Sequence, residues 1–224
     1  SGLWKLGRIL EQPGAASEDP ADEPNSAPAG TETPALRLGR VELAGLGFIS
    51  GLLVLCLEVL LQHQVAQVSI NSTFSSAFVL VFVLLGLGIA SWAANRGLVE
   101  ASTVPRRIVA ILGLCAAVTA VEPWLFHGFM PGLRPIPYTL PPTLYFGRLC
   151  GLGLVTVLPL LFVTGLVFPR LLRLAPSAGA VAGLLAWNGI GGWVGSELAD
   201  GFVGPQFGLW RGAGFCAVVY GLAG

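Results

Sequence analysis

The chain has 224 residues, of which 54% are hydrophobic and only 11% are charged, against about 25% charged in an ordinary soluble domain. Twelve basic residues balance twelve acidic ones, so the chain lacks the excess of positive charge typical of nucleic-acid-binding proteins. Most of the sequence is too apolar for a water-exposed surface, and the composition predicts an integral membrane protein.

The N-terminal part divides into two regions. Residues 1–10 alternate apolar side chains with two basic ones, which predicts a short amphipathic segment lying at the membrane surface or docking on a partner. Its expected contact residues are Trp4, Lys5 and Arg8. Residues 11–40 are rich in Ala, Pro and Ser with several acidic residues, a composition that predicts a flexible acidic linker.

Residues 41–224 form the predicted transmembrane domain. Their apolar segments are of the length, about 20 residues, that a spanning helix needs, and the short loops between them predict antiparallel neighbours. The predicted spans are 43–64, 74–95, 107–128, 148–172, 179–203 and 208–224. The expected fold class is therefore all-α, a polytopic bundle of about six transmembrane helices. The last segment is still apolar at Gly224, which suggests that the natural protein continues.

The loops differ in their content of basic residues. Nine of the twelve Lys and Arg residues fall on one side of the predicted membrane, and such residues are enriched in cytoplasmic loops. This asymmetry predicts a cytoplasmic N-terminus in a multi-pass protein of the inner (cytoplasmic) membrane. On the other side, loop 129–147 carries five of the sixteen prolines and is expected to form a non-helical cap at the outer interface.

The first predicted span contains a polar stripe. Successive members of the stripe are three or four residues apart, which predicts that they share one helix face; they are Gly47, Gly51, Leu55, Glu58 and Gln62. Two interpretations stay open. Glu58 is either protonated or paired and joins neighbouring helices, or it belongs to a proton or cation site.

The fifth predicted span has two different faces. Asn188, Gly191 and Gly195 share one face, and their spacing favours close helix packing. Trp193, Glu197 and Asp200 share another face, which is a candidate partner contact. Carboxylates facing lipid are costly, so Glu197 and Asp200 are expected to reach the interface, to pair with Arg148 or Arg211, or to meet a partner subunit.

The other reactive residue types show no catalytic or ligand-binding pattern. His63 and His127 end the first and third predicted spans and are expected to be interfacial polar residues; the alternative is a metal, haem or chlorophyll ligand. The four cysteines have no CxxC spacing and are expected to pack as small apolar residues. Because GxGxxG, Walker A, HExxH and GxSxG motifs are missing, we predict no catalytic residue, metal site or cofactor.

Four segments in order resemble the membrane region of bacterial fused, spermidine synthase-like membrane proteins. They are FISGLLVLCLEVLL (48–61), VLVFVLLGLGIASW (79–92), LLFVTGLVFPRLLR (160–173) and LAWNGIGGWVGSELADG (185–201). The resemblance covers residues 43–224 and includes the family's intramembrane glutamate as Glu58. Glu197 and Asp200 depart from it, because these positions are usually small or apolar in the family. Relatives carry an aminopropyltransferase-like domain after the membrane helices; these 224 residues do not include it, so no catalytic residue is transferred and enzymatic activity stays uncertain.

The expected function is that of a non-catalytic integral membrane module. It would anchor a spermidine synthase-like protein or serve as an accessory or structural subunit of a larger membrane complex, with the lipid bilayer and other membrane subunits as partners. The alternative is a transporter of a small cation or polyamine. It is motivated by acidic residues expected in the outer half of the bundle: Glu58, Glu122, Glu197 and Asp200.

Overall fold

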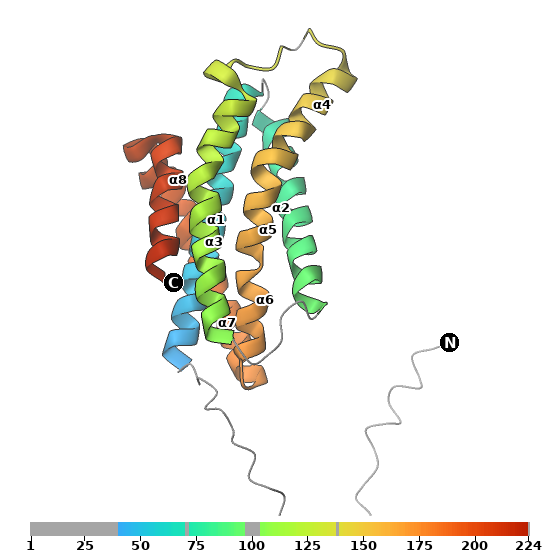
Figure 1. The fold of residues 1–224 in the computed structure, drawn as a ribbon. Helices are drawn as coiled ribbons and strands as arrows, with labels where there is room; N and C mark the ends of the chain where they lie inside the picture. The colour runs from blue at the N-terminus through green and yellow to red at the C-terminus, as the bar shows by residue number, and fades with distance from the viewer. Residues whose placement is uncertain (1–39, 70–71, 97–103, 138, 224) are drawn as a thin grey trace, which may run out of the picture. The chain divides into compact units, whose positions relative to one another are not determined.

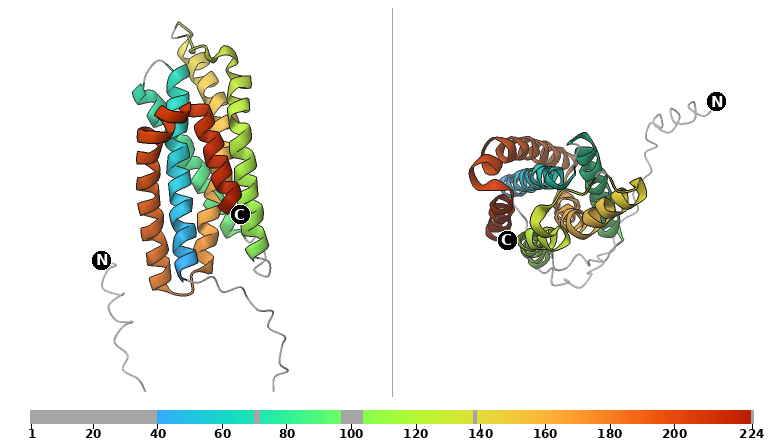
Figure 2. Two further views of the ribbon diagram at one scale, coloured as in Figure 1. Left: turned by 90° about the vertical axis from the view of Figure 1, so that its left-hand side faces the viewer. Right: turned by 90° about the horizontal axis from the view of Figure 1, so that it is seen from above.

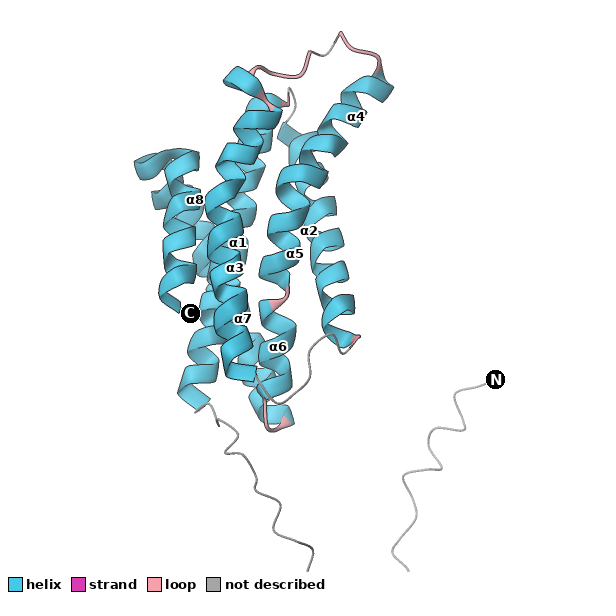
Figure 3. Ribbon diagram, in the orientation of Figure 1, coloured by secondary structure: helices cyan, strands magenta, loops and turns pink. Residues whose placement is uncertain are grey.

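The computed structural model describes residues 40–69, 72–96, 104–137 and 139–223. Every secondary-structure element within these ranges is a helix, as Figure 3 shows. The predicted amphipathic segment with Trp4, Lys5 and Arg8 lies outside the described residues, and so does nearly all of the predicted linker. The structure therefore bears on the predicted transmembrane domain alone.

Four helical stretches among the described residues are long and apolar enough to cross a membrane. The first three are α1 (Arg40–Val68), α2 (Ser72–Asn95) and α3 (Val104–Phe129). The fourth covers Pro142–Leu174. At 1.5 Å per residue, the shortest of the three continuous helices is about 36 Å long, which exceeds a hydrocarbon thickness of about 30 Å. The protein is thus a membrane-embedded helical bundle.

Two further helices, α7 (Ala178–Leu198) and α8 (Gly204–Ala223), correspond to the last two predicted spans but are not among these four. Both are rich in glycine, which makes them less apolar than helices built from Leu and Val. A five-residue π-helical turn, η4 (Ala199–Val203), connects them. Within α8, Gly208 adopts φ 72° and ψ 168°, a conformation that side chains disfavour, and the helix bends there.

The fourth stretch is helical throughout but not regular. It consists of α4 (Pro142–Leu152), the π-helical turn η3 (Gly153–Val157), α5 (Leu158–Gly165) and α6 (Val167–Leu174). Pro159 has no N–H to donate back along the helix, and the widened turn η3 ends two positions before it. The expectation that 129–147 is non-helical is wrong at Phe129, which ends α3, at the short 3₁₀ helix η2 (Pro131–Leu133), and from Pro142 onward. Proline is compatible with the first turn of a helix, where its missing N–H has no intrahelical partner.

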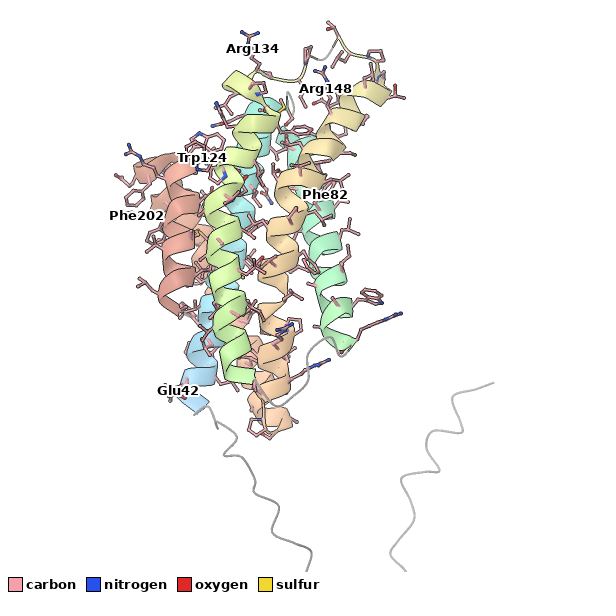
Figure 4. The ribbon with its side chains drawn as sticks, viewed as in Figure 1. Glu42, Phe82, Trp124, Arg134, Arg148 and Phe202 are labelled. Atoms are coloured by element: carbon pink, nitrogen blue, oxygen red, sulfur yellow. The ribbon has the colours of Figure 1, made fainter. Side chains whose placement is uncertain are left out.

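α1 is the central helix of the bundle. Seen from above in Figure 2, it lies among the other helices, and its most extensive contacts are with α7. Successive long helices run in opposite directions, so that Glu42 lies at one end of the bundle and Arg134 and Arg148 lie at the other (Figure 4). The core draws on every long helix and is rich in leucine. Its fully buried members include Leu53, Leu57, Leu60, Leu61, Leu160 and Leu161.

Candidate functional site

The seam between α1 and α7 brings glycine backbones into direct contact. A Cβ added at Gly191 would overlap the carbonyl oxygen of Phe48, and one added at Gly195 would lie 2.9 Å from the Cα of Leu52. A Cβ added at Gly51 would overlap the Asn188 carbonyl oxygen. The predicted packing residues Asn188, Gly191 and Gly195 therefore all lie in this seam. Such close approach maximises dispersion contacts and permits Cα–H···O contacts between helices.

Glu58 and Gln62 form a pair on α1 itself. Gln62 Nε2 donates a hydrogen bond to Glu58 Oε1 at 3.4 Å, one helical turn away. Both side chains are half-buried. The contact is long for a hydrogen bond, and it lies along α1 instead of joining α1 to another helix.

A more deeply buried polar pair joins α1 to α3. Gln64 Nε2 donates a hydrogen bond to Glu122 Oε2 across 58 positions of sequence, at 3.4 Å, as long as the contact between Gln62 and Glu58. Each residue is only 1% exposed. The remaining oxygens, Gln64 Oε1 and Glu122 Oε1, have no hydrogen-bond partner among the described residues, nor has the buried Thr119 hydroxyl one turn before Glu122. This cluster is the strongest candidate for an intramembrane polar site.

The pairing of Gln64 with Glu122 was not predicted from the sequence. Glu122 was expected only in the outer half of the bundle, and no role was predicted for Gln64. The available signal was a glutamate within an apolar segment, which is costly in a membrane unless it has a partner. Nothing in the local pattern identified the partner, because Gln64 lies on a different helix.

The two histidines, His63 and His127, lie at one end of the bundle, near the C-terminal ends of α1 and α3. His63 Nε2 lies 3.5 Å from Asp200 Oδ1, and both side chains are more than half exposed, at 53% and 66%. His127 is also exposed. Asp200 thus pairs with a histidine of α1 and not with Arg148 or Arg211, the partners considered from sequence. Among the described residues, no group of three or more His, Cys, Asp and Glu side chains is placed to hold a metal ion.

The outer face of α7 differs from its glycine face. Trp193 is 66% exposed, and Glu197, one turn later, is also exposed. No described cation forms an ion pair with Glu197. The helix therefore presents a large aromatic side chain and an unpaired carboxylate on the side that faces away from α1.

A thiol contact connects α1 to α8. The Sγ atoms of Cys56 and Cys216 lie 3.6 Å apart, although 160 positions separate them in sequence. Cys115 is buried as well, and its thiol contacts the Val163 carbonyl oxygen at 3.6 Å. Cys150 is exposed. Three of the four cysteines thus lie inside the bundle.

No protein family, curated protein or solved structure matches this chain. The resemblance to the membrane region of fused, spermidine synthase-like proteins stays a prediction. The function is therefore inferred from the geometry of the bundle and from the side chains exposed on its surface.

Proposed function

We propose that the chain is a non-catalytic module of the cell inner membrane, crossing it six times with its N-terminus in the cytoplasm. α7 packs along α1, a candidate span, and α8 packs against α1 and α3, which favours a location inside the membrane for both. The basic residues support the orientation. Arg173 donates a hydrogen bond to Asn95 Oδ1 at 3.3 Å, so the ends of α2 and α6 lie together. Arg96 and Arg173 are therefore at the same end of the bundle, as expected for basic residues on the cytoplasmic side.

The role we assign to this module is that of an accessory or structural subunit of a larger membrane complex. The observation that carries the proposal is the outer face of α7. Trp193 and Glu197 are exposed there, on a helix whose glycine face packs against α1. An unpaired carboxylate on a membrane helix is stabilised by a polar or cationic partner. Exposed aromatic residues are typical of the energetic centres of protein interfaces.

The test uses the protein in its native membrane. After extraction in a mild detergent, we expect it to migrate in an assembly much larger than the 23.3 kDa chain. The double variant Trp193→Ala/Glu197→Gln should be released from that assembly. Leu84→Ala, at a 63% exposed position of α2, is the control and should remain in it. A wild-type protein that migrates alone, or a double variant that stays bound, would contradict the proposal.

The module could instead anchor a spermidine synthase-like domain within its own polypeptide. This version rests on the resemblance alone. Reading the gene beyond the codon for Gly224 tests it directly. A Gly-rich strand–turn–helix of the Rossmann-like methyltransferase type would support the anchor, and another kind of sequence or a stop codon would reject it.

The rival proposal is transport of a small cation or polyamine, and the unpartnered Glu122 oxygen is the observation that favours it. Glu58 and Gln64, the partner of Glu122, are six residues apart on α1 and so point to different sides of it. The carboxylates therefore do not line one evident path. Uptake into proteoliposomes that is abolished by Glu122→Gln would establish transport, and absence of uptake by the wild type would reject it.

A further inference from the structure

A groove of about 550 Å³ lies between α3 and α8 on the outer surface of the bundle. The two helices are neighbours in Figure 2 and contact each other extensively. Small residues, among them Ala116, Ala120 and Gly214, line the groove. Trp124 and Val218 stand at its edges with 80% and 60% of their surfaces exposed, and Figure 4 shows Trp124 on the outside of the bundle.

The groove has a basic and aromatic end and an aliphatic end. Arg211 and Trp124 lie toward one end, and Ala116 and Val218 lie toward the other. Trp210, which precedes Arg211, packs edge-to-face against Phe126 with ring centroids 5.5 Å apart. This contact places Arg211 level with the last turns of α3, at the end of the bundle that also carries Arg134.

The level of Arg211 in the bundle follows from the contact that its neighbour Gly212 makes with α1. A Cβ at the adjacent Gly212 would lie 3.2 Å from the methyl groups of Leu60, which lies between Glu58 and the polar run from Gln62 to Gln64. Aromatic and basic side chains are typical of this level, where they reach the lipid headgroups. An arginine side chain at this level is long enough to extend its guanidinium toward the headgroups, and the lining residues Ala116 and Val218 lie farther from that end of the bundle.

The Arg211 guanidinium is exposed, and none of the described side chains pairs with it. An arginine presents five N–H donors in a planar fork that suits a phosphate group. A membrane-facing cation with no protein anion beside it favours an anionic ligand. The rest of the groove is open and lined by small residues, a shape that suits a flexible hydrocarbon chain.

We propose that this groove binds one phospholipid with a net negative headgroup. The lipid phosphate accepts hydrogen bonds from Arg211, and one acyl chain lies along Ala120, Gly214 and Ala116. The distance from Arg211 to Val218 is about 10 Å along α8, enough to hold the upper part of an acyl chain. Trp124 covers the side of the chain near the headgroup.

The experiment measures lipid retention by native mass spectrometry of the full chain, released from detergent with equal amounts of phosphatidylglycerol and phosphatidylcholine. We expect the wild type to retain one phosphatidylglycerol in preference to phosphatidylcholine. Arg211→Gln should weaken that retention by about tenfold, because a charge-assisted hydrogen bond is lost. Arg134→Gln removes a cation at the same end but outside the groove and should leave retention unchanged.

Three results would overturn the proposal. These are equal retention of the two lipids by the wild type, unchanged phosphatidylglycerol retention in Arg211→Gln, and an equal loss in Arg134→Gln. If the groove receives a transmembrane helix of a partner instead, the isolated wild type will show no lipid preference, and Arg211→Gln will release the partner from the native assembly. Neither lipid result depends on the Trp193 and Glu197 face, so this proposal and the subunit proposal stand or fall separately.

Discussion

Gly191 of α7 lies directly against the backbone of Phe48 on α1, with no room for a side chain between them. Its Cα faces the Phe48 carbonyl oxygen, and an added Cβ would overlap that oxygen and lie 3.0 Å from the Phe48 Cα. Because the obstructing atoms belong to the backbone, a change of rotamer cannot relieve the overlap. The distance between α1 and α7 therefore depends on the absence of a side chain at this position.

The first prediction concerns this glycine. Gly191→Ala should destabilise the detergent-solubilised protein by about 1–3 kcal/mol, because α7 must move away from α1 to accommodate the methyl group. The matched control is Gly189→Ala, two residues away, where an added Cβ meets nothing within 4 Å. That variant should be neutral or gain up to about 1 kcal/mol from helix propensity. Denaturation followed by circular dichroism measures both, and equal stabilities would show that the seam is not as close as described.

The second prediction concerns the buried Gln64–Glu122 pair. A double-mutant cycle with Gln64→Ala and Glu122→Ala should give a coupling energy of about 0.6–1.7 kcal/mol, between the average and the maximum for hydrogen bonds between membrane helices. Each single variant leaves one buried polar group without its partner. The same cycle on Gln62 and Glu58 serves as a comparison and should give less, because that pair is half-buried and lies on one helix. Zero coupling between Gln64 and Glu122 would mean that the hydrogen bond does not form.

The third prediction tests the position of α8. A membrane-permeant oxidant should link Cys56 to Cys216, since their sulfur atoms are 3.6 Å apart. Mass spectrometry of the digested protein identifies the linked peptides. Cys216→Ser should abolish the product, whereas Cys115→Ser should leave it intact. If Cys56 becomes linked to Cys115 or Cys150 instead, the packing of α8 on α1 is wrong.

The fourth prediction tests the proposed orientation. In a variant whose four natural cysteines are replaced by serine, Thr139→Cys should react with a membrane-impermeant maleimide added outside intact cells. Ala178→Cys should react only after the inner membrane is permeabilised. Both positions are exposed and lie in or beside loops at opposite ends of the bundle. The reverse labelling pattern would place the N-terminus outside the cytoplasm.

Much of the bundle follows from local sequence properties. Apolar segments of spanning length predict helices because every backbone polar group in a membrane must be hydrogen-bonded within its own segment. The spacing of Gly191 and Gly195 likewise predicts that they share a face, since helical periodicity requires it. The error at Pro142 arose because proline content alone does not distinguish a helix interior from a first turn, where proline is tolerated.

By itself, the sequence determined the membrane environment of this protein, its all-helical class and the small-residue face of α7. These features follow from the hydropathy and periodicity of residues within single helices. Only the tertiary structure decided which helices became neighbours. That choice brought Gln64 to Glu122, Asp200 to His63 and Cys216 to Cys56, and it left Arg211 beside an open groove. These contacts depend on the relative rotation and depth of whole helices, which are set by summed packing over many residues and carry no signal in any single segment.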